Sequence, residues 1–228
     1  MSARDVRIPV ALPTGEAEVS GLWAEVADAR ATVALAHGAG AGMDHPFLEG
    51  LASALAGDGF SVLRFVFPYV EAGRRMPGPA AHAVATWAGV QAWLGEQGIG
   101  SFVAAGKSYG GRMASVAAAE GALSPRALVY LGYPLHPPGR PDKPRADHLP
   151  AITVPQLFVE GENDPFIAPR EQFDAVVATC LDARVQWVEG ANHSFEVKGA
   201  RRPAEEIGAG LAGVVGEFVA GVAGVAGS

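Results

Sequence analysis

The segment 102–111, FVAAGKSYGG, contains the pattern G-x-S-x-G centred on Ser108. A serine in this pattern sits on a sharp turn between a strand and a helix, with its hydroxyl exposed for attack on an acyl carbon. The flanking residues suit such a turn, because residues 102–105 form a short apolar run and residues 113–117 place apolar side chains at helical spacing. The pattern therefore predicts that Ser108 is a nucleophile.

Two nucleotide-binding patterns resemble parts of the sequence but fail on spacing. The letters GKS also end the phosphate-binding pattern G-x-x-x-x-G-K-[ST], which would need a glycine where the chain has Ser101. The dinucleotide pattern G-x-G-x-x-G, started at Gly38, would need its last glycine where the chain has Met43. The sequence therefore favours the nucleophile interpretation.

A serine nucleophile needs a base and a carboxylate that orients the base. Asp164, in ENDPF, and His193, in ANHSF, follow the last two predicted strands. Loops beyond the carboxyl ends of parallel strands meet at one edge of a sheet. We therefore expect Ser108, Asp164 and His193 to form a catalytic triad in the chain order Ser, Asp, His. Asp164 as a turn cap, His193 as an ordinary loop histidine and Glu162 as the acid are the alternatives.

The acyl intermediate also needs two N–H donors for its oxyanion. One donor is expected from Tyr109, the residue after the nucleophile. The other is expected from the glycine-rich loop HGAGAGMDHP, with Ala39 favoured and Gly40 next. His37 in this loop is interpreted as a bracing residue and not as a catalytic one.

These residues are separated by alternating strands and amphipathic helices. Strands are expected over 6–12, 18–26, 32–38, 61–67, 102–106, 127–135, 154–161 and 184–190. Helices are expected around 48–55, 84–94, after Ser108, around 173–181 and from about 203 onward. The alternation predicts an α/β fold, with a mainly parallel central sheet of about eight strands and helices on both faces. Prolines in segment 136–153 argue against a long helical lid, and no linker divides residues 1–228, so we expect one domain.

Composition limits the classes of function. The chain of 228 residues is 49% hydrophobic, with a formal net charge of −7 and no long basic run, so nucleic acid is not an expected partner. The single cysteine, Cys180, is interpreted as a packing residue on a helix and suits a reducing compartment. The N-terminal residues lack the apolar stretch of a signal peptide. Together these features predict a cytoplasmic protein.

Residues 207–227 form the most apolar segment of the chain. Only Glu217 interrupts it with a charge, and G-x-x-x-G spacings occur within it. A membrane span is the alternative, but its large apolar side chains lie on one helical stripe while alanine and glycine fill much of the rest. We expect a terminal helix packed on the domain and no membrane span.

Other side chains are expected near the site. A substrate pocket is predicted to include Tyr69, Arg112, Phe166 and Phe195, with core packing as the alternative for the aromatic residues. The cations Lys107, Arg112, Arg74 and Arg75 are candidates for binding an anionic group, or are surface or ion-paired charges. No cluster has metal-ligand spacing, and neither a metal nor an organic cofactor is expected.

The motifs HGAG, GKSYGG, GENDPF and GANHSF, in this order, resemble the α/β-hydrolase superfamily over nearly the full chain. More narrowly, HGAGAGMDHPF, RFVFPYVEAGRR, YLGYPLHPPGRPDK and HLPAITVPQLFVEGENDPF resemble the dienelactone-hydrolase-related, testis-expressed-protein-30-like group. The resemblance implies a compact hydrolase with little or no cap, with Ser108, Asp164 and His193 as its triad. The chain departs from dienelactone hydrolases proper, because its nucleophile is a serine and not a cysteine.

These observations predict a serine hydrolase that cleaves a small to medium carboxylic ester or thioester through an acyl-enzyme intermediate. The same triad also supports acyl transfer to an acceptor other than water. A non-catalytic interaction protein on a hydrolase fold is the alternative from another class. Neither the substrate nor the oligomeric state follows from the sequence.

Overall fold

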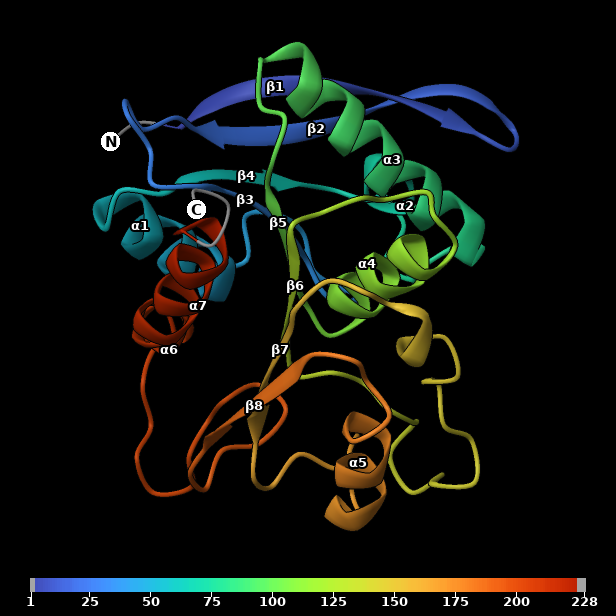
Figure 1. The fold of residues 1–228 in the computed structure, drawn as a ribbon, viewed down its shortest axis with the longest axis vertical. Helices are drawn as coiled ribbons and strands as arrows, with labels where there is room; N and C mark the ends of the chain where they lie inside the picture. The colour runs from blue at the N-terminus through green and yellow to red at the C-terminus, as the bar shows by residue number, and fades with distance from the viewer. Residues whose placement is uncertain (1–2, 225–228) are drawn as a thin grey trace.

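The computed structural model describes residues 3–224 and contains one eight-stranded sheet (Figure 1). The strand order is β1-β2-β4-β3-β5-β6-β7-β8. The strands are β1 (Arg4–Leu12), β2 (Gly15–Ala24), β3 (Thr32–Ala36), β4 (Ser61–Phe65), β5 (Val103–Lys107), β6 (Ala127–Leu131), β7 (Gln156–Gly161) and β8 (Ala183–Val188). The predicted sheet of about eight strands is confirmed.

The sheet is antiparallel only at one end. β1 pairs with β2, and β2 with β4, in antiparallel orientation, whereas β4, β3, β5, β6, β7 and β8 are parallel neighbours. The loops that follow β3, β5, β7 and β8 therefore emerge at the same edge of the sheet. These loops carry the residues predicted to do the chemistry.

The central strands are buried on both faces and consist of short apolar runs. In β3, β4 and β6 every residue is buried, as expected for strands covered by helices on both sides. The edge strand β8 instead alternates between exposed and half-buried residues. β6 ends at Leu131 and not at the predicted residue 135, because Gly132 has a φ of 70°, outside the extended region.

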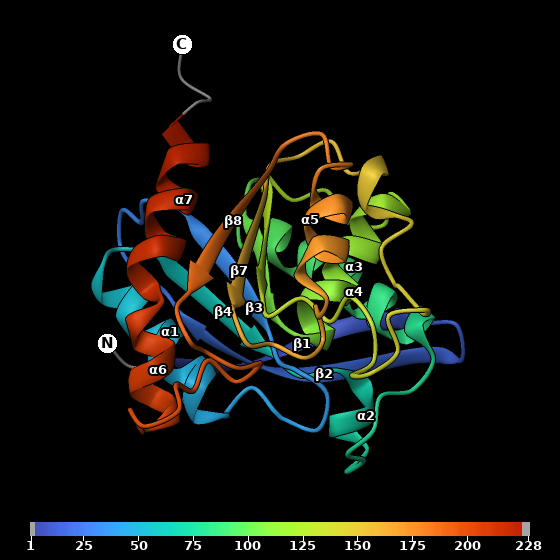
Figure 2. The same cartoon turned by 90° about the horizontal axis from the view of Figure 1, so that it is seen from below.

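Helices cover both faces of the sheet (Figures 1 and 2). One face carries α1 (Pro46–Gly57), α6 (Ala204–Gly210) and α7 (Ala212–Gly224). The other carries α3 (Ala80–Glu96), α4 (Tyr109–Ala119) and α5 (Arg170–Val177). The short α2 (Pro68–Glu71) and a 3-10 turn at Leu149–Ala151 were not predicted.

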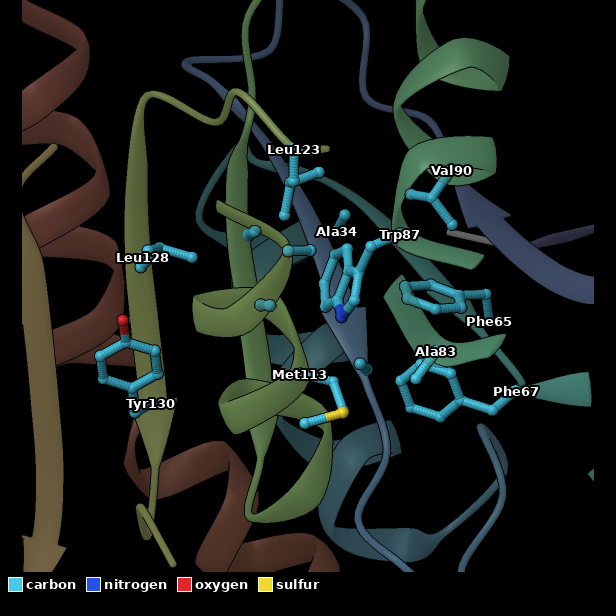
Figure 3. Packing of buried hydrophobic residues seen from close by; sticks show 14 of the residues in the cluster. Ala34, Phe65, Phe67, Ala83, Trp87, Val90, Met113, Leu123, Leu128 and Tyr130 are labelled. Atoms are coloured by element: carbon cyan, nitrogen blue, oxygen red, sulfur yellow. The ribbon is translucent and has the colours of Figure 1, made fainter. Parts of the chain in front are cut away.

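Each face has its own hydrophobic core. Under α3 and α4, Trp87 lies fully buried against the sheet, with its ring 4.9 Å from that of Phe65 in an edge-to-face arrangement (Figure 3). On the opposite face, Phe60, Leu51 and Val215 are buried in a second cluster between the sheet and the helices α1 and α7. The sheet thus separates two packed layers, as in other α/β proteins.

The C-terminal helices belong to the second core. The segment Ala204–Gly224 is long and apolar enough to cross a membrane by length and composition, with a mean hydropathy of 1.6. Its large side chains Val215, Phe218 and Val219 are nevertheless buried against the domain. The predicted helical stripe therefore packs on the domain; the last three residues of the predicted segment 207–227 lie outside the described residues.

Two details differ from the sequence-based expectations. α5 ends at Val177, so Cys180 lies in the turn after the helix and is half-buried, and Leu181 is 69% exposed. The proline-rich connection 136–153 contains only the 3-10 turn, so within the described residues no helical lid lies between β6 and β7. The expectation of little or no cap is therefore confirmed.

Candidate active site

Ser108 lies on a sharp turn between β5 and α4. Its backbone has φ 49° and ψ −113°, a strained conformation for a residue with a side chain. The turn depends on glycines on both sides. A Cβ at Gly110 would lie 2.5 Å from the carbonyl oxygen of His37, and a Cβ at Gly106 would collide with the backbone of Gly111. Gly106 allows β5 and α4 to approach closely, and Gly110 allows the start of α4 to lie against the end of β3, which together hold Ser108 at the sheet edge.

The loops after β7 and β8 position Asp164 and His193. The N–H of Asn163 donates to the carbonyl of Ala191, which ties the two loops together. In the second loop the side-chain oxygen of Asn192 accepts from the N–H groups of Ser194 and Glu196. His193 is therefore held within a hydrogen-bonded turn.

Ser108, His193 and Asp164 form a continuous hydrogen-bonded chain. The hydroxyl oxygen of Ser108 lies 2.9 Å from Nε2 of His193, and Nδ1 of His193 lies 2.6 Å from Oδ2 of Asp164. A proton on Nδ1 donates to the carboxylate, which leaves Nε2 able to accept the serine proton. Ser108 and His193 are 85 positions apart in the chain, and Asp164 and His193 are 29 positions apart, but the three residues meet at one site.

Asp164 and the His193 ring are fixed from several sides. Asp164 is only 2% exposed, and its second oxygen accepts the N–H of Phe166 at 2.8 Å. The ring of Phe166 stacks on the imidazole, with a centroid separation of 4.0 Å. Both carboxylate oxygens are thus engaged, and the imidazole has one packed face.

The local charges act on His193 in opposite directions. Burial lowers the pKa of His193, its hydrogen bond to Asp164 raises it, and the charge of Lys107 lowers it. The net pKa lies below the ordinary histidine value of 6.5. At neutral pH the imidazole is therefore mostly unprotonated, as a general base must be.

Lys107 and Glu160 are two further ionisable residues close to these loops. Nζ of Lys107 donates to the carbonyl oxygen of His193 at 2.6 Å and lies 5.2 Å from the ring centre of Phe195. Burial lowers the pKa of Lys107 to about 8. Glu160 is fully buried on β7 and accepts the N–H of Tyr133 at 2.6 Å, and burial raises its pKa well above the usual range.

The residues predicted to bind an oxyanion lie beside Ser108. Tyr109 is the first residue of α4, and Ala39 follows β3 in the adjacent loop; both line the same cavity as Ser108. Within residues 3–224, neither N–H donates to a protein group. The backbone N–H groups of both residues are therefore not used by other protein groups of the described part of the chain, and both residues lie at the cavity of Ser108.

His37 braces the loop that carries Ala39. Its Nδ1–H donates to the carbonyl of Gly38 at 2.8 Å, and its Nε2 accepts the N–H of Phe67 at 3.1 Å. Burial lowers the pKa of His37, which favours this neutral tautomer. The bracing role expected from the sequence agrees with these contacts.

A cavity of about 660 Å³ opens above Ser108. One wall comes from α1 and α6 and contributes the apolar residues Phe47, Leu48 and Ile207. Because α1 and α6 lie on one face of the sheet and α4 on the other, Tyr109 and Arg112 line the opposite wall. The cavity therefore extends to both sides of Ser108.

The four residues predicted for the pocket divide into two pairs. Arg112 and Phe166 line the cavity. Tyr69 and Phe195 do not, which corrects the prediction for both. Tyr69 is buried against His37, and Phe195 is 3% exposed and stacks on Phe47 at 5.7 Å. Their aromatic rings contribute more by packing against neighbouring rings than by contacting solvent in the cavity.

Sequence reasoning missed Glu160, the contact made by Lys107 and the cavity residue Arg145. A signal for Glu160 was present, because a glutamate within the apolar strand QLFVEG is unusual. Arg145 lies in an irregular connection, where the sequence has no periodicity to place a side chain.

A second serine–histidine pair lies away from the cavity. The hydroxyl oxygen of Ser115 is 2.7 Å from Nε2 of His148 and donates to the carbonyl of Arg112. Ser115 is fully buried and is not among the residues that line the cavity. No carboxylate is hydrogen-bonded to His148 within the described residues, so the pair lacks the third member of a triad.

No grouping of three or more His, Cys, Asp or Glu side chains suited to a metal ion occurs among residues 3–224.

Several solved structures have a fold similar to that of this chain. A dienelactone hydrolase from Anabaena variabilis is 22% identical, with a TM-score of 0.72, covering 96% of this chain and 97% of that chain. A serine hydrolase without a lid from Xanthomonas campestris is 20% identical, with a TM-score of 0.70 and 95% of each chain covered. An esterase from Thermogutta terrifontis is 20% identical, with a TM-score of 0.70, covering 96% of this chain and 99% of that one.

A family model for the α/β-hydrolase domain matches residues 29–211, which span β3 to the start of the C-terminal helices. This match includes the turn at Ser108 and the loops that carry Asp164 and His193. Together with the sheet order and the absence of a helical lid, it leads to one conclusion: this chain belongs to the α/β-hydrolase domain family.

Proposed function

We propose that this protein is a serine hydrolase that cleaves a carboxylic ester or thioester of small to medium size. The observation that carries the proposal is the hydrogen-bonded chain from Ser108 through His193 to Asp164, at the floor of a cavity. The esterase-like fold supports the same reaction class.

The chemistry proceeds in two steps. Nε2 of His193 takes the proton of Ser108 as the serine oxygen attacks the acyl carbon, while Asp164 stabilises the imidazolium. The backbone N–H groups of Tyr109 and Ala39 stabilise the oxyanion of the tetrahedral intermediate. His193 then protonates the leaving group, and water, activated by the same imidazole, releases the acyl group from Ser108.

Two alternatives use the same structure differently. Acyl transfer requires an acceptor other than water in the second step, and product analysis with added alcohols or amines distinguishes it from hydrolysis. A non-catalytic interaction protein would not react with an active-site probe. We also propose that this protein belongs to the testis-expressed-protein-30-like group. We further propose that residues 1–228 form a single domain and that the protein is cytoplasmic.

Labelling with a fluorophosphonate probe tests the nucleophile. Ser108→Ala is expected to abolish labelling and to lower kcat on p-nitrophenyl esters by about 10⁶-fold, the order seen when a triad serine is lost. Ser115→Ala is the matched control, because it removes the other histidine-bonded serine hydroxyl. It is expected to retain labelling. Labelling that persists in Ser108→Ala and disappears in Ser115→Ala would contradict the assignment.

A further inference from the structure

The charge of the cavity is opposite to the charge of the protein. The chain has 24 acidic against 17 basic residues, a formal net charge of −7. The cavity wall nevertheless contains three cationic side chains, Lys107, Arg112 and Arg145, and only one carboxylate, Glu196. Glu196 is hydrogen-bonded to Asn192, so it is held within its own loop.

Arg112 is the cation placed next to the nucleophile. It lies one helical turn after Ser108, and its backbone N–H donates to the backbone carbonyl of Ser108 at 3.0 Å. Residues at this spacing lie on the same face of a helix. Nε of Arg112 is buried and has no hydrogen-bond partner among the described residues. A buried donor without a partner costs free energy unless something outside the chain satisfies it.

Other part-buried arginines in this structure are satisfied by the protein itself. Arg64 donates to the carbonyl of Met43 at 2.8 Å, and Arg126 donates to the carbonyl of Val222 at 2.6 Å. Some exposed arginines pair with a carboxylate, as Arg140 does with Asp142 at 2.9 Å. Arg112 has no such carboxylate within the described part of the chain. A structural ion pair therefore does not account for it.

A second arginine, Arg145, lines the same cavity as Arg112. The hydroxyl of Tyr133 donates to the backbone carbonyl of Arg145 at 2.9 Å, and the side chain of Arg145 is exposed at the cavity. It too lacks a carboxylate partner among residues 3–224. Burial, with the positive charge of Arg112, lowers the pKa of His148 to about 4, so His148 adds no further positive charge near Arg112. The surroundings leave the two guanidinium groups uncompensated.

We propose that Arg112 and Arg145 form a subsite that binds an anionic group of the substrate. The preferred substrate is then an ester or thioester that also carries a carboxylate or phosphate group. The proposal rests on the proposed function for its ester chemistry. A guanidinium presents planar donors that match the oxygens of either group. The anion occupies the α4 side of the cavity, and the apolar part of the substrate occupies the wall formed by Leu48 and Ile207.

Paired substrates test the subsite. The first pair is the p-nitrophenyl monoester of glutarate and its neutral methyl-ketone isostere, p-nitrophenyl 5-oxohexanoate. This pair places the carboxylate, or the ketone that replaces it, on the acyl side of the scissile bond. The second pair places the carboxylate, or the ketone that replaces it, on the leaving group. Its members are S-acetyl-3-mercaptopropionate and S-acetyl-4-mercapto-2-butanone. We expect kcat/KM to favour the anionic member of at least one pair by about 10- to 100-fold, the order of a charged hydrogen bond.

Arg112→Gln and Arg145→Gln are expected to lower that preference about tenfold or more. Arg140→Gln is the matched control, because it removes an exposed arginine from the same connection and leaves the cavity intact. It is expected to leave the preference unchanged. Equal turnover of both members of both pairs, or a preference unaffected by Arg112→Gln and Arg145→Gln, would overturn the subsite while the hydrolase function stands.

Binding separates the subsite from the proposed reaction. Calorimetry on the Ser108→Ala protein, with glutarate and inorganic phosphate as probes, needs no turnover and compares a carboxylate with a phosphate. Binding of either probe that is lost in the Ser108→Ala, Arg112→Gln double variant supports the subsite even if no ester is cleaved. Absence of binding by both probes to the Ser108→Ala protein would overturn it.

Discussion

The imidazole of His193 determines the pH at which the site works. The base must be neutral, so kcat/KM is expected to rise with pH as His193 loses its proton. Because burial and the charge of Lys107 together outweigh Asp164, the pKa is lowered, and the midpoint is expected below 6.5. The measurement is kcat/KM for one active ester between pH 5 and 9.

Lys107→Met tests whether the charge of Lys107 lowers the pKa of His193. Removing the ammonium removes an influence that lowers the pKa of His193, so the midpoint is expected to move to higher pH. A loss of the contact between Lys107 and the carbonyl of His193 would lower the rate but would not by itself displace the midpoint. Lys143→Met, at an exposed lysine, is the control. An unchanged midpoint in Lys107→Met would contradict the electrostatic effect.

Asp164 is expected to orient His193 through Oδ2. Asp164→Asn keeps the side chain's shape but places an amide beside Nδ1, and kcat is expected to fall by about 10⁴-fold, as when a triad carboxylate is lost. Glu162→Gln is the matched change, because Glu162 lies on the same loop but accepts the N–H of Gly190 instead. If Glu162→Gln were the damaging change and Asp164→Asn nearly silent, Glu162 would be the acid.

At the scale of elements, the contact between β5, α4 and β3 keeps Ser108 in its strained turn. Gly110→Ala adds a Cβ that lies 2.5 Å from the carbonyl of His37 and 2.8 Å from Cβ of Ala36. Both neighbours belong to the end of β3, so the start of α4 must move away from it. Because Tyr109 begins α4 and Ala39 lies in the loop that follows β3, the proposed oxyanion donors separate.

We expect Gly110→Ala to lower kcat by about 10²-fold or more, the order seen when one oxyanion donor is lost. Gly95→Ala in α3 is the control, because its added Cβ meets no atom within 4 Å. In that variant kcat is expected to stay at the wild-type value, and the melting temperature to stay or rise, since alanine favours a helix more than glycine does. Full activity in Gly110→Ala would contradict the close packing at this turn.

At the scale of the whole molecule, the C-terminal helix completes the second core. Phe218 on α7 is 7% exposed within the cluster that includes Leu55 and Phe60. Phe218→Ala is expected to lower the free energy of unfolding by about 3–5 kcal/mol, the usual cost of emptying an aromatic site in a core. Urea denaturation in detergent-free buffer measures it.

Leu181→Ala is the control for this change, because Leu181 is 69% exposed. Surface substitutions of this kind usually change the free energy of unfolding by no more than about 0.5 kcal/mol. If Phe218→Ala were as mild as Leu181→Ala, the helix would contribute little to the core, and the apolar segment would need another explanation.

The sequence by itself determined the strand and helix order, because buried runs and helical stripes are local patterns. It also determined the candidates Ser108, Asp164 and His193, because each stands at a strand's carboxyl end, where a parallel sheet brings its loops together. The turn at Ser108 was equally local, since its glycines are neighbours in the chain.

Only the tertiary structure decided which side chains face the cavity. Tyr69, Phe166 and Phe195 are all aromatic residues on loops or short turns near the site, yet only Phe166 lines the cavity. Their directions depend on packing against residues distant in the chain, such as Phe47 for Phe195. The same holds for the position of Arg145 at the cavity that Arg112 also lines, because an irregular connection has no periodicity from which a side chain's position follows.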